Sequence, residues 1–267
     1  MYYALGREYH QSRIPAPGLF SRLTGDVHRI GGVELVDQNP IGKSSRSNPV
    51  TYIKAYDDIR KLFSEQPYAR MNGYGQSHFS FNIEGGRCPE CQGEGVVKVE
   101  MQFMADVTLT CESCQGKRFQ PDILEVRYKE RNIYDVLEMT VREAIDFFSS
   151  HDDPTARRIV ERLMPLDQVG LSYIKLGQSS SSLSGGESQR VKLAYYLSRE
   201  NTMTNLLFIF DEHTPGLHVY DIDKLLKSFS ALISKGHTVL VVEQKMAVVK
   251  CAEWGIDLGP VADDKRS

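Results

Sequence analysis

The stretch LSGGESQR, residues 183–190, contains a serine, two glycines and a glutamate in the order expected at the start of a helix. Free backbone N–H groups and the helix dipole make such a start a favourable anion site, and glycines let a phosphate approach closely. Ser184, Gly185, Gly186 and Glu187 are therefore candidate nucleotide-binding residues. The alternative is a simple capping box, in which Ser184 and Glu187 satisfy each other's backbone N–H groups.

Strand-like and helix-like segments alternate after this stretch. LLFIF at 206–210 and TVLVV at 238–242 are short apolar runs, and we expect TVLVV to be a strand buried on both faces. The apolar residues between them recur at helical spacing: Ile222, Leu225, Leu226, Phe229, Leu232 and Ile233. Such alternation favours an α/β fold with a parallel sheet and crossover helices.

Polar side chains follow both predicted strands. Asp211 and Glu212 come directly after LLFIF, and Glu243 and Gln244 come directly after TVLVV. In an acidic pair of this kind one carboxylate can hold Mg²⁺ through water while the next polarises an attacking water. Because α/β folds bind ligands at this sheet edge, Asp211 and Glu212 are candidate catalytic residues and Gln244 a candidate nucleotide-binding residue. Taken alone, an acidic pair at a strand end is common.

Two cysteine pairs form the pattern C-x2-C-x19-C-x2-C: Cys88, Cys91, Cys111 and Cys114. Four thiolates on two knuckles can surround one tetrahedral Zn²⁺, and four protein ligands leave no open position for a reactive water, so we predict a structural zinc. A redox dithiol or a disulfide pair is the alternative reading. The fifth cysteine, Cys251, is expected to be a core residue.

Short alternating segments around these pairs, between about residues 51 and 135, indicate a small β-rich module. Glycines follow both knuckles, at Gly93, Gly95 and Gly116, and would let backbone N–H groups turn toward the sulfurs. Beyond the module, Thr140 and Glu143 have the spacing of a helix-starting capping box.

The composition is that of a soluble globular protein, with 41% hydrophobic and 25% charged residues. The formal net charge of −3 gives no overall cationic field, so any DNA contact must come from local patches. The candidates are Lys43 and Arg46 in an acid-free loop, and Lys117 with Arg118 beside Phe119. Each patch is equally consistent with a solvated loop. Because neither a membrane-length apolar run nor a signal core is visible, we expect a cytoplasmic protein without membrane contact.

The segment IGKSS, residues 41–45, resembles the end of a phosphate-binding loop but does not complete one. The pattern G-x-x-x-x-G-K-S requires glycine at position 37, where this sequence has Asp37. Pro40 also removes a backbone N–H that such a cradle needs. The segment is therefore not a complete phosphate-binding loop.

Taken together, long stretches of the chain resemble the C-terminal half of the UvrA family, the ABC-type ATPases that recognise damage for the bacterial excinuclease. The matching stretches are VDQNPIGKSSRSNPVTY, FSFNIEGGRCPECQGEG, KVEMQFMADV, CESCQGKRF, VGLSYIKLGQSSSSLSGGESQRVKLA, FIFDEHTPGLH and WGIDLGP. By this resemblance Gln38 is the Q-loop glutamine, residues 184–187 are the ABC signature, Asp211 is the Walker B aspartate and Glu212 is the catalytic base.

The resemblance implies a partial ABC cassette with a zinc-module insertion and a helical signature subdomain. Its expected divisions are a cassette remnant at 1–50, a signature subdomain at 51–182 with the zinc module at 86–119, and the signature, Walker B and switch region at 183–267. The implied ligands are a structural Zn²⁺, with ATP and Mg²⁺ only in a completed composite site. The implied partners are damaged duplex DNA, a UvrB-like helicase subunit and a UvrA-type homodimer or complementing cassette.

Several positions depart from the family pattern. The family's second Walker A loop precedes a segment resembling LYYALGRE, so Met1 is expected to begin just past it. His213 stands where proline is usual, Gln244 where the switch histidine is expected, and VADDKRS replaces a glycine-rich ending. We therefore expect this chain to be inactive alone. A second hypothesis is a zinc-stabilised DNA- or protein-binding module without catalysis; a third, a transporter cassette, is weakened because such cassettes need no zinc module.

Overall fold

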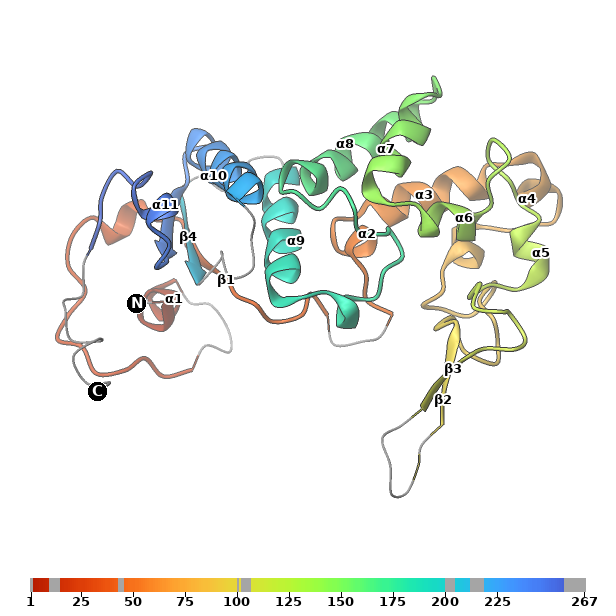
Figure 1. The fold of residues 1–267 in the computed structure, drawn as a ribbon, viewed down its shortest axis with the longest axis horizontal. Coiled ribbons are helices and arrows are strands. Elements are labelled where there is room, and N and C mark those ends of the chain that lie inside the picture. The colour runs from red at the N-terminus through yellow and green to blue at the C-terminus, as the bar shows by residue number, and fades with distance from the viewer. Residues whose placement is uncertain are drawn as a thin grey trace. The chain divides into compact units, whose positions relative to one another are not determined.

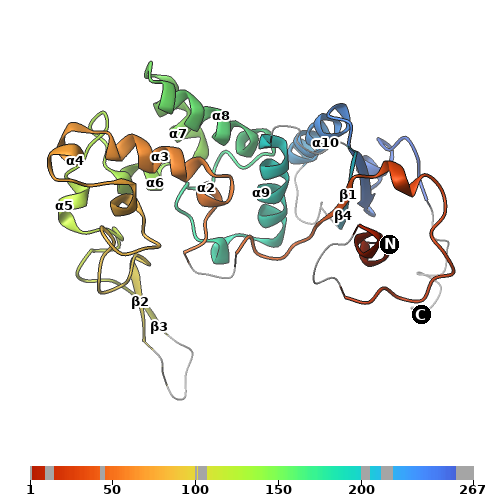
Figure 2. The same cartoon turned by 180° about the vertical axis from the view of Figure 1, so that it is seen from behind.

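The computed structural model describes residues 2–9, 15–42, 46–99, 101, 107–199, 205–211 and 219–256, which form two compact units (Figures 1 and 2). The sheet unit comprises the described residues of Met1–Leu35 and Asn205–Ser267. The helical unit comprises those of Val36–Thr204.

The sheet unit is built on three strands in the order β1-β4-β5. Its elements are α1 (Tyr2–Glu8), η1 (Val27–Arg29), β1 (Gly32–Val36), β4 (Leu206–Asp211), α10 (Val219–Ser234), β5 (Thr238–Val242) and α11 (Met246–Val249). β4 and β5 are parallel, with Asp211 opposite Val242, and α10 forms the crossover between them. The predicted parallel sheet with a crossover helix is confirmed.

The central strand β4 buries side chains on both of its faces, as alternation along a strand requires. Leu207 and Ile209 join Val33 of β1 and Leu5 of α1 in one apolar cluster. Phe208 and Phe210 are also buried, and Phe210 packs 4.6 Å, centroid to centroid, from Phe229 of α10. β4 is thus held by α1 on one side and by α10 on the other.

Three sequence-based expectations about burial in this unit are wrong. TVLVV is not buried on both faces, because β5 lies at the edge of the three described strands and Val242 is 50% exposed. Ile233 is 46% exposed, because α10 faces the sheet through Ile222, Leu225, Phe229 and Leu232 and turns Ile233 away. Cys251 is exposed rather than a core residue, since it follows the short helix α11 at the unit's surface.

The helical unit contains most of the helices and a two-stranded antiparallel hairpin. Its elements are α2 (Pro49–Tyr52), α3 (Ala55–Ser64), α4 (Pro67–Met71), η2 (Gln76–Phe79), β2 (Val96–Val99), β3 (Val107–Thr110), α5 (Pro121–Leu124), α6 (Ile133–Glu138), α7 (Val141–Ser149), α8 (Pro154–Gln168), η3 (Ser180–Ser182) and α9 (Gly185–Ser198).

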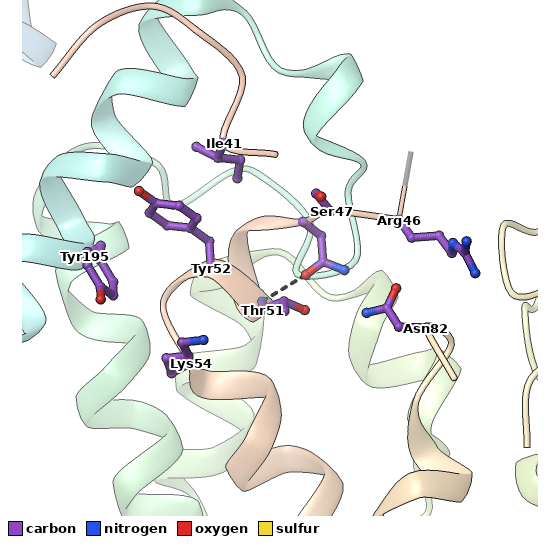
Figure 3. A pocket seen from close by; sticks show the side chains of 9 residues that line it. Ile41, Arg46, Ser47, Thr51, Tyr52, Lys54, Asn82 and Tyr195 are labelled. Carbon is purple, nitrogen blue, oxygen red and sulfur yellow. Dashed lines mark hydrogen bonds between the residues drawn. The ribbon is translucent and has the colours of Figure 1, made fainter. Parts of the chain in front are cut away.

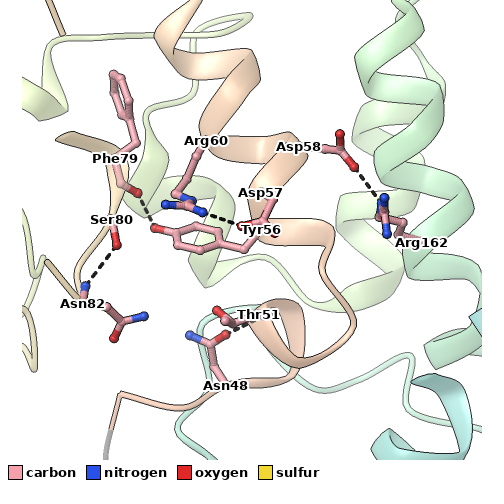
Figure 4. Close-up of polar contacts among 10 residues, drawn as sticks. All are labelled: Asn48, Thr51, Tyr56, Asp57, Asp58, Arg60, Phe79, Ser80, Asn82 and Arg162. Atoms are coloured by element: carbon pink, nitrogen blue, oxygen red, sulfur yellow. Dashed lines mark hydrogen bonds and ion pairs between the residues drawn. The ribbon is translucent and has the colours of Figure 1, made fainter. Parts of the chain in front are cut away.

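Helix α8 is the centre of this unit and packs against α3, α7 and α9. Ile159 and Leu163 on α8 are fully buried. Asp58 of α3 forms an ion pair with Arg162 of α8 at 2.7 Å (Figure 4) and a second one with Arg158 at 3.5 Å. Because α9 packs on α8, the signature helix groups with residues 36–204 and not with 205–267. The three-segment division expected from sequence stays a prediction.

The start of α7 is capped as predicted. The Thr140 backbone N–H donates to Glu143 Oε2 at 2.8 Å, and the Glu143 N–H donates to Thr140 Oγ1 at 3.2 Å. Among the described residues, no helix combines the length and the apolar character required to cross a bilayer.

The neighbours Leu232 and Ile233 provide a direct test of how α10 packs. We expect Leu232→Ala to lower the free energy of unfolding by about 2–5 kcal/mol, because it opens a cavity against the sheet. Ile233→Ala removes a side chain from the exposed face and should change stability by no more than about 0.5 kcal/mol. Urea denaturation of both variants measures this, and similar losses would contradict the orientation of α10.

Candidate metal centre and nucleotide-binding elements

The four predicted cysteines converge in the helical unit. The Sγ atoms of Cys88, Cys91, Cys111 and Cys114 all lie within 4.8 Å of one another, and all four residues are buried. The Sγ atoms of Cys91 and Cys114 are 3.6 Å apart, and those of Cys88 and Cys111 are 3.9 Å apart. A tetrahedral zinc with Zn–S bonds of about 2.3 Å places its sulfurs about 3.8 Å apart, so the cluster fits one such ion. The separations are far too long for a disulfide bond.

The two knuckles share one backbone conformation. Gln92 and Gly93 have φ angles of 50° and 84°, and Gln115 and Gly116 have φ angles of 50° and 81°. Both steps are left-handed, which explains the repeated Gln-Gly sequence, because glycine adopts this region without strain. At Gly93 an added Cβ would also lie 2.2 Å from the Phe81 carbonyl oxygen.

Backbone N–H groups support the sulfurs, as the glycines suggested. The Gly95 N–H donates to Cys91 Sγ at 3.2 Å. Burial disfavours ionisation of Cys88, but N–H groups of Cys91 and Glu90 and the Ser113 hydroxyl outweigh it and lower its pKa to about 7. Burial, reinforced by the neighbouring thiols Cys91 and Cys111, raises the pKa of Cys114 to about 12. Because a metal ion is bound by the thiolate form of cysteine, a cation at the centre of the cluster would favour loss of the thiol protons.

The residues after the second knuckle join the module to the rest of the unit. Arg118 donates from Nη1 to the Gly177 carbonyl at 3.0 Å and lies over the Phe81 ring at 5.6 Å. Phe119 is buried and contacts Phe81 edge-on. The half-buried Arg118 guanidinium is thus engaged within the unit, whereas Lys117 is exposed.

The predicted signature begins a helix whose cap is confirmed. The Ser184 N–H donates to Glu187 Oε2 at 2.8 Å, and the Glu187 N–H donates to Ser184 Oγ at 3.2 Å. Gln38 packs on this start, since a Cβ added to Gly185 would lie 2.9 Å from Gln38 Oε1. Apart from the backbone of α9 itself and the two chain neighbours, no described residue lies within 4 Å of the corresponding position on Gly186. The structure therefore brings the predicted Q-loop glutamine and the signature together.

Two contacts that the sequence did not predict hold this arrangement. The Tyr173 hydroxyl donates to Glu187 Oε1 at 2.6 Å, and Arg190 reaches the Tyr173 oxygen at 3.4 Å. Lys192 of α9 pairs with the Asp37 carboxylate and donates to the Asp37 carbonyl at 3.0 Å. Each contact joins two different segments of the chain. Neither helical periodicity nor capping spacing predicts such contacts.

The other nucleotide-binding candidates belong to the sheet unit. Asp211 ends β4 and is exposed. Glu243 follows β5, and its carboxylate accepts from the N–H groups of Gln244 and Lys245, which precede α11, at 3.0 and 3.1 Å. Glu212 and Lys43 lie outside the described residues, and Arg46 donates to the Gln92 carbonyl at 3.3 Å.

Comparison with known proteins finds extensive similarity to UvrABC system protein A of several bacteria. The chain is 49% identical over 249 residues to UvrABC system protein A of Clostridium perfringens and 51% identical over 247 residues to that of Aquifex aeolicus. These matches cover 93% and 90% of this chain but 26% of each relative. The chain thus spans about a quarter of the length of the curated relatives it matches.

The fold is also that of a solved relative. The crystal structure of UvrA2 from Deinococcus radiodurans matches with a TM-score of 0.79 and 45% identity, covering 86% of this chain and 28% of that one. No protein-family model matches the chain.

The Tyr173 contact predicts the titration of Glu187. Burial favours the protonated acid, but hydrogen bonds from Tyr173 and Ser184 outweigh it and hold the pKa of Glu187 below its ordinary value. The stability linked to this carboxylate is therefore present above the ordinary glutamate range and is lost as the pH falls through the lowered pKa. Tyr173→Phe removes one donor, so we expect the pKa of Glu187 to rise.

An NMR titration that follows the Glu187 carboxyl carbon measures the change, with Tyr68→Phe as a control, because Tyr68 is an exposed tyrosine elsewhere in the unit. An unchanged Glu187 pKa in Tyr173→Phe would show that the hydroxyl does not hold the carboxylate.

Proposed function

We propose that this chain acts in nucleotide excision repair as part of a UvrA-like damage-recognition ATPase. It is similar to about a quarter of the length of UvrABC system protein A. The observation that carries the proposal is the pairing of a four-cysteine module with a capped signature helix whose first glycine lies against Gln38. A transporter cassette has no need for such a module. Sequence identity over nearly the whole chain supports the same assignment.

The proposed catalytic chemistry is phosphoryl transfer in a composite site. Asp211 would hold Mg²⁺ through water, and Glu212 would orient and deprotonate the attacking water. Ser184 to Glu187 would contribute a helix N-terminus to the γ-phosphate, with Gln38 and Gln244 as polar neighbours of the nucleotide. The bound nucleotide would come from a surface carrying a complete Walker A loop, because these 267 residues contain no G-x-x-x-x-G-K-[ST] sequence.

The metal that we propose for the cysteine cluster is Zn²⁺ in a structural role. All four positions of a tetrahedral ion would be filled by Cys88, Cys91, Cys111 and Cys114, so no water would be activated. The ion would supply folding energy to a segment whose own cluster contains little besides the cysteines and the partly buried Val97.

The proposed macromolecular partners are damaged duplex DNA, a UvrB-like subunit and a second UvrA-type cassette. For DNA, the candidate contacts are the exposed Lys117, together with Lys43 and Arg46. Arg118 is a weaker candidate, since its guanidinium is engaged by Gly177 and Phe81.

One observation favours a second candidate function, a DNA- or protein-binding module without catalysis. Gln244 stands where the family's switch histidine is expected, and a glutamine amide cannot exchange a proton at neutral pH as imidazole does. Activity in the presence of a complementing cassette separates the two functions.

Zinc content tests the metal proposal. We expect one equivalent of zinc per chain when the protein is purified without chelator, and loss of zinc together with unfolding of the β2–β3 region in Cys88→Ser. Cys251→Ser is the matched control, because Cys251 is an exposed thiol outside the cluster. Zinc below about half an equivalent, with Cys88→Ser unchanged in fold, would overturn the assignment.

ATP hydrolysis tests the proposed composite site. A polypeptide of these 267 residues should release phosphate from ATP at background rates, because positioning of the β- and γ-phosphates supplies most of the catalysis. Addition of a cassette that carries an intact Walker A loop should raise the rate, and Glu212→Gln should abolish the increase. Robust turnover by the chain alone, lost in Glu212→Gln, would reveal a phosphate cradle elsewhere in it.

DNA binding is expected to be weak and steeply salt-dependent, because a few local cations act within a chain of net charge −3. Fluorescence titration of a labelled duplex at two salt concentrations measures this. Replacing Lys43 and Lys117 with glutamine should weaken binding and flatten the salt dependence, whereas replacing Lys61 and Lys227, two lysines that each form an ion pair with an acidic residue four positions away, should not. Equal effects of the two double variants would rule out these contacts.

A further inference from the structure

The segment that carries Gln38 has no regular secondary structure to fix it. β1 ends at Val36, and residues 37–40 are neither helix nor strand. Further along, Ile41 lines a pocket of about 520 Å³ together with Tyr195 of α9 (Figure 3). Because open space offers no partner atoms, packing on that side restrains the segment only weakly. Specific polar contacts therefore take a larger part in placing Gln38.

The Asp37 carboxylate makes such contacts across Gln38. The backbone N–H of Asn39 donates to Asp37 Oδ1 at 3.2 Å, and the Asn39 side-chain amide donates to Asp37 Oδ2. These bonds join the residues before and after Gln38 into one turn, of the kind that aspartate side chains favour. The turn restricts the backbone of Gln38, but it does not by itself place that residue against another element.

Lys192 joins this turn to the signature helix α9. Its ammonium group pairs with the Asp37 carboxylate and also donates to the Asp37 carbonyl at 3.0 Å. The Lys192 side chain is only 14% exposed, so water screens this pair less than a pair on open surface. Burial favours the protonated acid of Asp37, but Lys192 and Asn39 outweigh it and hold the pKa of that carboxyl below its ordinary value.

The spacing along α9 connects this contact with the start of the helix. Gly185 and Lys192 are seven residues apart, which is almost two turns, so both lie on the same face of α9. Helical side chains lean toward the N-terminus, and Lys192 therefore extends toward Gly185. A Cβ added to Gly185 would lie 2.9 Å from Gln38 Oε1 and 3.0 Å from Gln38 Cβ. Lys192 thus holds Asp37 where Gln38 can pack on the bare backbone of Gly185.

We propose that Lys192 is a positioning residue of the composite ATP site, because by holding Asp37 it fixes Gln38 against the first glycine of the signature helix. This role rests on the proposed function and adds to it a residue outside the signature itself. Gln38 and residues 184–187 would meet the nucleotide as one element with a preset spacing. Groups fixed in this way need no rearrangement when the transition state forms.

The side-chain amide of Gln38, followed by NMR in the 267-residue chain, reports this position without any nucleotide. Lys192→Met removes the charge and the donors but keeps a long side chain, so we expect the Gln38 amide resonances to shift. Asp37→Asn should also shift them, and the double variant should show a smaller shift than the sum of the two, because both changes break one contact.

Lys61→Met is the matched control for the NMR measurement, because Lys61 pairs with Glu65 on α3. Its Gln38 resonances should stay where they are in the unaltered chain. Unchanged Gln38 resonances in Lys192→Met, or an equal shift in Lys61→Met, would overturn the proposal.

ATP turnover separates a positioning role from a merely structural one. With a cassette that carries an intact Walker A loop, Lys192→Met should lower kcat by about 10- to 100-fold, the size of effect that a misplacement of about 1 Å produces. KM for ATP should stay nearly unchanged, because the complementing surface holds the nucleotide. Lys192→Arg keeps the charge and the donors and should retain most of kcat.

Two outcomes of the turnover experiment distinguish this role from the proposed function. A kcat that Lys192→Met leaves unchanged would overturn the positioning role and leave the proposed function standing. Absence of turnover by the unaltered chain with that cassette would reject the proposed function, on which the role of Lys192 rests.

Discussion

Four buried thiols brought within 4.8 Å of one another are the constraint on which the helical unit depends. The two described strands of the hairpin that connects the knuckles form no core of their own, because β3 is exposed along its whole length and β2 is at most half-buried. Apolar burial therefore cannot define the positions of the cysteines. Left-handed Gln-Gly turns and backbone donors aim the sulfurs at one point, and a tetrahedral cation at that point would complete the fold of the module.

This constraint extends from the cysteines to the signature helix. Arg118 and Phe119 follow the second knuckle and join it to Phe81 and to the Gly177 carbonyl. Gly177 lies in the segment that leads through η3 into α9, whose start is fixed by Ser184 and Glu187. The module and the candidate anion site are thus parts of one compact unit. In this arrangement a metal that is not catalytic would still determine how well the signature is positioned.

Local sequence signals predicted much of this organisation, and contacts between distant segments explain the rest. The capping boxes at Thr140 and Ser184 and the four-cysteine cluster depend on fixed short spacings, so they could be read directly from the sequence. The exposure of β5, Ile233 and Cys251 could not, because it depends on which element covers which face. Tyr173 and Lys192 were missed for the same reason: each gains its role from a partner in another segment.

X-ray absorption spectroscopy at the zinc edge of the metal-loaded chain tests the central claim most directly, because it reports the number and type of atoms bound to the ion. Four sulfurs at about 2.3 Å, with no lighter ligand, are predicted. A shell that contains nitrogen or oxygen, or fewer than four sulfurs, would show that the two knuckles do not close around one ion and would contradict the account of how this unit is held together.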